Sequence, residues 1–238
     1  MSYNPVTVEL RDVWKKYSRQ GIFHRSFRED IVNIFRPKRQ MSGLYRDEFW
    51  ALKGINLNVK RGQTVGLYGP NGAGKSTILK LIARVTFPTR GEVFVNGRIA
   101  PLIEIGAGFH PDLSGRENIF MNASILGMKL PETRKKMASI IAFSELEEFI
   151  DMPVKKYSSG MYLRVAFSVA IHSEADVYLI DEILSVGDEG FQKKCIDKVH
   201  ELQNNGKTMI IVTHNRELMG KLTDRVFFIK KGEIVDCL

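Results

Sequence analysis

One stretch of eight residues constrains this chain more than any other part of its sequence. The stretch GPNGAGKS, residues 69–76, follows the short apolar run TVGLY and opens the segment KSTILKLIARV, whose apolar residues recur at helical spacing. It matches the pattern G-x-x-x-x-G-K-[ST], in which glycines let backbone N–H groups turn inward around phosphate. The start of the following helix adds positive potential. The sequence therefore predicts a phosphate-binding loop; a glycine-rich turn that binds nothing is the alternative.

The residues of this loop have predicted roles toward ATP. Lys75 would reach the β- and γ-phosphates, and Ser76 would offer its hydroxyl to Mg²⁺. The residues predicted to surround the phosphates are Gly69, Pro70, Asn71, Gly72, Ala73, Gly74, Lys75, Ser76 and Thr77. The loop alone predicts a nucleotide-binding superfamily but no particular task.

A second motif lies at the end of another predicted strand. The segment VYLIDE, residues 177–182, has four apolar residues followed by two carboxylates. Asp181 would join the Mg²⁺ shell, and Glu182 would polarise a water for in-line attack on the γ-phosphate. Acids at the start of a helix are common and offer an alternative explanation. The order of the two motifs along the chain favours the catalytic interpretation.

Apolar strands alternate with helical segments along most of the chain, and this pattern predicts a mainly parallel α/β sheet. Residues from about 106 to 173 are mostly helical in pattern and predict a helical subdomain. Two hairpins are predicted, one around the Asn-Gly pair within residues 91–105 and one over the closing segment RVFFIKKGEIVD. We treat residues 1–238 as a single domain with an insertion over 18–46.

Composition limits the class of protein. Cys195 and Cys237 have neither disulfide-framework nor metal-ligand spacing, which suits a reducing cytosol. The N-terminus MSYNPVTVEL lacks the charged and apolar regions of a signal peptide. No apolar run approaches the ~20 residues that span a bilayer. The sequence therefore predicts a protein that is soluble or peripheral to a membrane.

Most of the positive charge gathers in and around the insertion. The formal net charge is +8, and residues 15–46 carry +7 of it, from nine basic and two acidic residues. A local patch of this kind predicts an acidic partner, namely nucleic acid, anionic lipid or an acidic protein surface. A solvated face without a partner is the more ordinary explanation of a charge run.

The insertion also contains a predicted helix within residues 22–40. Ser26 and Glu29 form a capping-box pattern, and Pro37 ends the helix. One face carries the apolar residues Phe27, Ile31, Ile34 and Phe35. This face either packs on the protein's own core, lies on a membrane surface, or accompanies basic residues that grip nucleic acid. We favour the membrane surface.

A third motif resembles a known family. The segment YSSGMYLRVAFSVA, residues 157–170, begins a predicted helix with the hydroxyl of Ser158 and the backbone N–H of Gly160. These two residues fit the signature LSGGQ of ABC ATPases. Three positions depart from that signature, namely Tyr157, Ser159 and Met161.

The remaining landmarks of ABC ATPases follow in order. Asp188, within ILSVGDEG, resembles the acidic position of the D-loop, and His214, after the run TMIIVT, resembles the switch histidine. Glu104 stands where the family has the glutamine of its Q-loop, and its carboxylate would join the Mg²⁺ or water shell. Tyr17 occupies the place of the aromatic residue that stacks on adenine, in competition with Trp14, Phe49 and Trp50.

The segments 104–128, 157–170 and 181–195 are similar to those of one subfamily. This subfamily comprises the ATPase subunits of ABC exporters for bacterial cell-surface polysaccharides, among them O-antigen (Wzt-like), capsule and teichoic-acid exporters. The resemblance implies a P-loop NTPase fold with a RecA-like core, an antiparallel β subdomain and an α-helical subdomain. It also implies that Phe109, His110 and the residues after them lie near the contact with a membrane subunit.

The resemblance further implies a homodimer that holds two ATP molecules between its subunits. The implied catalytic residues are Glu182, His214 and Lys75. The implied Mg²⁺ ligands are Ser76, Asp181 and Glu104. The residues implied to contact the ATP of the other subunit are Ser158, Ser159, Gly160 and Asp188.

The implied partners are an integral membrane permease, the membrane surface through the 22–40 helix, and a lipid-linked polysaccharide as cargo, with no nucleic acid. The implied location is peripheral, on the cytoplasmic face of the bacterial inner membrane. The alternative function is a soluble ABC-type ATPase that acts on nucleic acid or ribosomes. Such proteins usually carry two cassettes in one chain or a long coiled-coil insertion.

Overall fold

The computed structural model describes residues 6–18, 47–103, 105–106, 108–181 and 187–238. The predicted helix within 22–40, Glu104 and Glu182 lie outside these ranges. Within them, no helix combines the length and the apolar character needed to cross a membrane.

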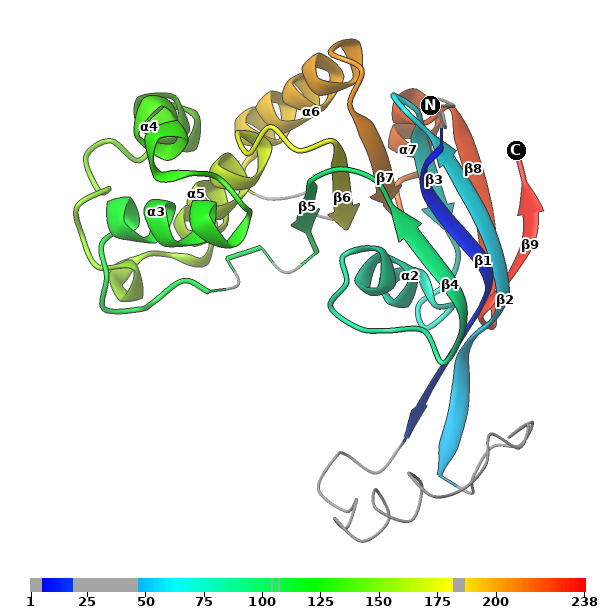
Figure 1. Cartoon of the computed structure of the whole chain (residues 1–238). Helices are drawn as coiled ribbons and strands as arrows, with labels where there is room; N and C mark the ends of the chain where they lie inside the picture. Colours follow the sequence, from blue (N-terminus) through cyan, green and yellow to red (C-terminus); the bar gives the residue numbers. More distant parts are fainter. Residues whose placement is uncertain (1–5, 19–46, 104, 107, 182–186) are drawn as a thin grey trace, which may run out of the picture.

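The larger sheet gathers the predicted buried strands side by side (Figure 1). Its strand order is β5 (Ile99–Leu102), β6 (Val177–Asp181), β7 (Thr208–Val212), β3 (Thr64–Tyr68), β8 (Arg225–Lys230) and β9 (Glu233–Cys237). Neighbouring strands are parallel, except that β9 pairs antiparallel with β8. Strands β3, β6 and β7 are almost entirely buried, as parallel strands covered on both faces must be. The predicted parallel sheet and the predicted closing hairpin are both confirmed.

A smaller antiparallel sheet has the strand order β2 (Glu48–Lys60), β1 (Val6–Ser18) and β4 (Arg90–Val95). The pair β1 and β2 is long, and one end of it projects beyond the rest of the fold (Figure 1). At that end Ser18 lies opposite Glu48. The chain therefore leaves the sheet for the insertion and returns from it at one place.

The prediction of a hairpin around Asn96-Gly97 is wrong. Strand β4 pairs with β1, whereas β5 pairs with β6 in the other sheet. A Cβ on Gly97, which has a φ of 106°, would lie 2.5 Å from the carboxylate of Asp176. That carboxylate accepts a hydrogen bond of 2.8 Å from the backbone N–H of Arg98. The Gly97 turn therefore carries the chain from one sheet to the other rather than back along the same sheet.

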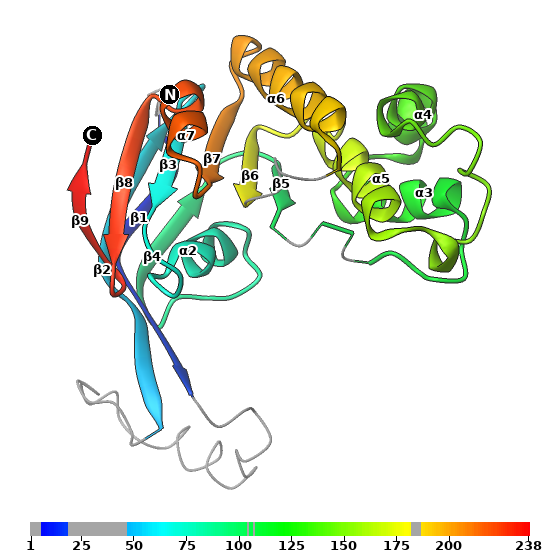
Figure 2. The same cartoon turned by 180° about the vertical axis from the view of Figure 1, so that it is seen from behind.

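The predicted helical subdomain is present. It contains α3 (Gly115–Ile125), α4 (Leu130–Ser144), the short η2 (Val154–Lys156) and α5 (Ser159–Ile171). Seen from behind, α3, α4 and α5 lie together at one end of the molecule, away from the three-stranded sheet (Figure 2). The other helices in the described part of the chain are α2 (Lys75–Ile82), α6 (Glu189–Asn204) and α7 (Arg216–Leu222).

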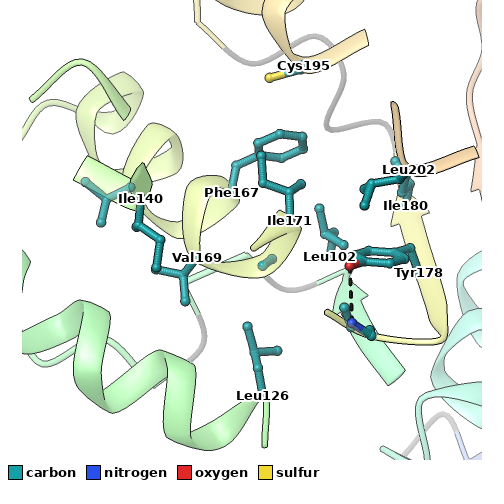
Figure 3. Close-up of a cluster of buried hydrophobic side chains, with 14 of the residues drawn as sticks. Leu102, Leu126, Ile140, Phe167, Val169, Ile171, Tyr178, Ile180, Cys195 and Leu202 are labelled. Atoms are coloured by element: carbon teal, nitrogen blue, oxygen red, sulfur yellow. Dashed lines mark hydrogen bonds between the residues drawn. The ribbon is translucent and has the colours of Figure 1, made fainter. Parts of the chain in front are cut away.

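Two apolar clusters cover the two faces of the larger sheet. Tyr178 and Ile180 of β6 join a cluster formed with α3, α4, α5 and α6, while Val177 and Leu179 join a cluster with α2 and the smaller sheet. Alternate residues of a strand point to opposite faces, which explains this division. Figure 3 shows Phe167 of α5 in the first cluster, and the Tyr178 hydroxyl accepting a hydrogen bond of 3.2 Å from the backbone N–H of Ala175.

Candidate nucleotide-binding site

The glycine-rich loop lies between β3 and α2, in the predicted context. Gly72 and Gly74 have φ values of 75° and 114°, a conformation that side chains with a Cβ rarely adopt. A Cβ on Gly69 would lie 2.2 Å from the carbonyl oxygen of Ile229, so β8 packs directly against the loop. These glycines are therefore required by the shape of the loop and by its close contact with the sheet.

Lys75 begins α2 and is buried, with 6% of the residue exposed. Its Nζ donates hydrogen bonds of 2.7 Å to the carbonyl oxygen of Gly69 and 3.0 Å to that of Pro70. The ammonium group thus lies inside the curve of the loop, where it bridges two backbone carbonyl groups of the loop. A phosphate bound there would offer this cation charged oxygens in place of neutral carbonyls.

Ser76 and Asp181 meet at the carboxyl edge of the larger sheet. The Ser76 hydroxyl donates a hydrogen bond of 3.2 Å to the Asp181 carboxylate, although the two residues come from α2 and from the end of β6. A hydroxyl and a carboxylate are hard oxygen ligands of the kind that Mg²⁺ prefers. This pair fits the predicted ion, whereas Glu104 and Glu182 lie outside the described residues.

A cavity of about 740 Å³ opens over the loop. It is lined by Tyr17, Phe49, Trp50, Ala51, Lys53, Asn71, Gly72, Ala73, Gly74, Lys75, Ser76, Thr77, Asp181 and Lys231. The lining of the cavity thus combines polar groups of the loop with three aromatic side chains. This combination suits a ligand with phosphate groups and a flat ring system.

The lining of the cavity reduces the number of aromatic residues that could stack on adenine. The rings of Tyr17 and Phe49 lie with their centroids 6.2 Å apart, and Lys15 Nζ lies 5.0 Å from the Tyr17 centroid. Trp14 does not line the cavity and packs edge-on against Trp50, with ring centroids 5.4 Å apart. Tyr17, Phe49 and Trp50 therefore remain as candidates for stacking, and Trp14 does not.

The signature segment lies elsewhere. Ser158 caps the N-terminus of α5, where its hydroxyl accepts a hydrogen bond of 3.2 Å from the backbone N–H of Met161. Ser158 and Ser159 are exposed, and neither they nor Gly160 line the cavity over the loop. The structure therefore does not bring these residues together with the phosphate loop of the same chain.

Asp188 caps the N-terminus of α6. Its carboxylate accepts a hydrogen bond of 3.0 Å from the backbone N–H of Phe191 and also pairs with Arg164 of α5. The Phe191 N–H, followed by the charge of Arg164, lowers the pKa of Asp188. No local pattern in the sequence points to Arg164, because its partners lie 19 and 24 positions away.

The predicted switch histidine, His214, lies outside the lining of the cavity. His214 is exposed, follows β7 by two residues, and does not line the cavity.

Near the predicted Q-loop, the Tyr162 hydroxyl donates a hydrogen bond of 2.7 Å to the carbonyl oxygen of Gly106, and burial raises the Tyr162 pKa. Phe109 packs on the same ring, with centroids 4.9 Å apart. Helix α5 is thereby joined to the segment that follows Glu104.

The arrangement of loop, carboxylate and signature helix agrees with a family model described as ABC transporter, which matches residues 52–185. The chain belongs to the ABC transporter family. Two relatives support this placement. An O-antigen export system ATP-binding protein RfbB of Myxococcus xanthus is 48% identical, over 94% of this chain and 52% of its own length. One of Klebsiella pneumoniae is 46% identical, over 84% of this chain and 82% of its own length.

A third relative, the teichoic acids export ATP-binding protein TagH of Listeria monocytogenes, is 39% identical over 96% of this chain and 66% of its own length. The predicted resemblance to the polysaccharide-export subfamily is therefore confirmed. The chain spans about half the length of the Myxococcus relative.

Solved structures show the same fold. A dimeric ATP-binding cassette in a post-hydrolysis state with ADP and phosphate has a TM-score of 0.76, 24% identity, and covers 97% of each chain. An ATP-binding subunit of an ABC transporter has a TM-score of 0.77 and 20% identity, over 98% of this chain and 89% of that one. The predicted ABC ATPase fold is confirmed.

Proposed function

We propose that this chain hydrolyses ATP as the nucleotide-binding subunit of an exporter that moves a lipid-linked polysaccharide out of the cytoplasm. The observation that carries the proposal is the meeting of Lys75, Ser76 and Asp181 beneath an aromatic-lined cavity. The cargo is inferred from the relatives, whose names assign them to O-antigen and teichoic acid export.

Each of the predicted site residues has a separate role in hydrolysis. Lys75 exchanges its two carbonyl partners for phosphate oxygens and offsets the negative charge of the transition state. Glu182 orients and polarises the attacking water, and His214 contacts the γ-phosphate. Ser76 and Asp181 would hold Mg²⁺, which neutralises phosphate charge when bound, and Glu104 is a further candidate ligand.

Two copies of the chain complete each site. Ser158, Ser159 and Gly160 begin a helix of 13 residues but do not line the cavity of their own chain. The free N–H groups and positive potential of that helix start suit the γ-phosphate of a nucleotide held by another copy. We infer a homodimer in which ATP lies between the phosphate loop of one subunit and the signature segment of the other, next to Asp188.

The subunit works at a membrane, on its cytoplasmic face. An integral membrane permease is the partner that converts ATP-driven closure of the dimer into movement of the cargo. The predicted 22–40 helix adds a second contact, to the anionic membrane surface. Its attachment at the Ser18–Glu48 end of the projecting strand pair favours this role, because both ends of the insertion leave the fold together.

The first experiment measures phosphate release from Mg·ATP by the purified protein and by Lys75→Ala and Glu182→Gln variants. Wild type is expected to hydrolyse ATP, and both variants are expected to lose at least about 100-fold in rate. Glu182→Gln is also expected to form an ATP-dependent dimer in light scattering, because it binds ATP without turning it over. Turnover that survives either substitution would contradict the assigned chemistry.

The second experiment tests the cargo. In the native bacterium, deletion of the gene is expected to leave lipid-linked polysaccharide inside the cell and to remove it from the surface. Wild type restores the surface polymer, and Lys75→Ala does not. Unchanged surface polysaccharide in the deletion strain would reject this cargo.

The third experiment tests the membrane contact by co-sedimentation with anionic and neutral liposomes, with RNA as competitor. A variant that replaces residues 21–39 with a short linker keeps the Ser18–Glu48 pairing and serves as control. Wild type is expected to bind anionic liposomes and the variant is not, while both hydrolyse ATP. Preferential binding to RNA through the same segment would favour the alternative function in nucleic-acid handling.

A further inference from the structure

The turn between β8 and β9 has an unusual residue for its backbone. Lys230 pairs with Glu233, so Lys231 and Gly232 form a two-residue hairpin loop. Their φ values are 51° and 81°. Hairpin loops with two positive φ values strongly prefer Asn-Gly or Asp-Gly. The short polar side chains of Asn and Asp can hydrogen-bond to the nearby backbone and so tolerate a positive φ better than longer side chains do. Lysine at 231 is therefore a poor choice for the turn itself.

The same turn is fixed against the nucleotide site. The backbone N–H of Gly232 donates a hydrogen bond of 2.9 Å to the carbonyl oxygen of Ala73 in the phosphate loop. The carbonyl oxygen of Gly232 accepts one of 2.8 Å from the backbone N–H of Lys53 on β2. A Cβ on Gly232 would lie 2.6 Å from the carbonyl oxygen of Ala51, so the turn packs directly against β2.

The contacts of the turn indicate where Lys231 meets the cavity. Ala73 belongs to the phosphate loop, and Ala51 directly follows the aromatic Trp50. Lys231 lines this cavity, and the turn that carries it contacts both Ala73 of the phosphate loop and Ala51 of β2. Its neighbour Lys53 is paired with Glu233 at 3.4 Å, whereas no carboxylate pairs with Lys231 within the part of the chain that the structure describes.

We propose that Lys231 is a nucleotide-binding residue that contacts the α-phosphate and ribose region, the part that ATP and ADP share. The proposal rests on the nucleotide binding proposed above. A cation fixed by a rigid turn between the phosphate loop and the aromatic residues meets the negative charge of the nucleotide without reorganisation. The unfavourable backbone of Lys231 is consistent with a residue retained for binding rather than for the turn.

A Lys231→Asn variant distinguishes a role in nucleotide binding from a role in the turn alone. Lys231→Asn suits the turn better and removes the charge, so it should raise the Tm by about 1–3 °C. It should also raise the Kd of both ATP and ADP by the same factor, roughly 3- to 10-fold. A residue with only a structural role would change the Tm and leave both Kd values unchanged.

The test measures the Kd of fluorescent ATP and ADP analogues, together with the Tm, for wild type, Lys231→Asn, Lys231→Arg and Lys230→Gln. Lys231→Arg should stay within about twofold of wild type because it keeps the charge. Lys230→Gln is the matched control, since Lys230 is exposed on the same hairpin and does not line the cavity.

Two results would count against the assignment, and a third, distinguishable from them, would count against the proposed function. Unchanged affinity in Lys231→Asn would overturn the inference alone. Weaker binding of ATP with unchanged binding of ADP would overturn its assignment to the shared part of the nucleotide. Failure of wild type to bind either nucleotide would instead reject the proposed function itself.

Discussion

The guanidinium group of Arg164, on α5, donates a hydrogen bond of 2.5 Å to Asp188 at the start of α6. The same group donates a hydrogen bond of 2.7 Å to Glu145 at the end of α4, and it lies 4.6 Å from the centroid of the Phe191 ring. The side chain of Arg164 is only 16% exposed. One side chain thus joins the ends of two helices to the helix that carries the signature segment.

Replacing Arg164 should destabilise the fold more than breaking a similar pair at the surface. Arg164→Gln removes both ion pairs of a largely buried guanidinium group, together with its contact with the Phe191 ring. We expect a loss of roughly 3–6 °C in Tm for a chain of this size. Thermal unfolding followed by circular dichroism measures the loss.

A matched control lies in the same subdomain. Arg116 donates hydrogen bonds of 2.7 Å and 3.0 Å to Asp151, but these side chains are 42% and 71% exposed. Arg116→Gln should therefore lower the Tm by no more than about 2 °C. An equal loss of Tm in the two variants would show that the ion pairs of Arg164 stabilise the fold no more than an exposed surface pair does.

Acid should weaken the ion pairs that Arg164 forms with Glu145 and Asp188. The hydrogen bond from Lys194 lowers the pKa of Glu145, and the Phe191 N–H lowers the pKa of Asp188, with Arg164 contributing to both. Both carboxyl groups ionise more readily in the folded chain than in the unfolded one. The stability that they supply is complete above their unfolded pKa values near ~4 and is lost as the pH falls through the folded values.

The measurement is the Tm between pH 7 and pH 3, for wild type and for a Glu145→Gln/Asp188→Asn double variant. Asparagine still caps a helix, so the double variant removes charge while keeping the α6 cap. Its Tm should fall less steeply with acid than that of wild type. Parallel curves would exclude this pair of carboxylates as a source of the pH dependence.

Local features of the sequence were enough to predict the phosphate loop. The positive φ values of Gly72 and Gly74 and the burial of Lys75 are requirements of the loop itself, and they involve residues that are close in sequence. The apolar runs of β6 and β7 likewise predicted buried parallel strands. These elements are predictable because their own residues determine them.

Other features depend on which distant segments meet. Asn96-Gly97 has the composition of a hairpin turn, but the Asp176 carboxylate and the edge of β6 direct the chain into the other sheet. Arg164 has partners 19 and 24 positions away, on other helices, and no periodicity in the sequence reveals them. Lys231 is similar, since only the tertiary structure places the β8–β9 turn beside the phosphate loop.

The aromatic side chains that line the cavity give a third prediction. Tyr17 lines the cavity and Trp14 does not, so Tyr17→Ala should raise the Kd of ATP by roughly 3- to 10-fold through loss of stacking. Trp14→Phe should change it less than about twofold. Titration with a fluorescent ATP analogue measures both values. A larger effect of Trp14→Phe would show that stacking occurs outside this cavity.

The two cysteines should react at very different rates. Cys195 of α6 is fully buried in the cluster of Figure 3, and burial raises its pKa to about 12. At pH 8 only about one such thiol in ten thousand is ionised, and the thiolate is the reactive form. Cys237, near the end of β9, is partly exposed and accepts a hydrogen bond of 2.8 Å from Arg225 Nε.

An aromatic disulfide reagent at pH 8 should therefore label one thiol per chain quickly and the second only as fast as the protein unfolds. In a Cys237→Ser variant the fast phase should disappear, while the slow phase should accelerate with urea in step with the unfolding rate. Two fast thiols in the native wild type would show that α6 opens readily from the helical cluster. That result would contradict the full burial of Cys195 in the apolar cluster.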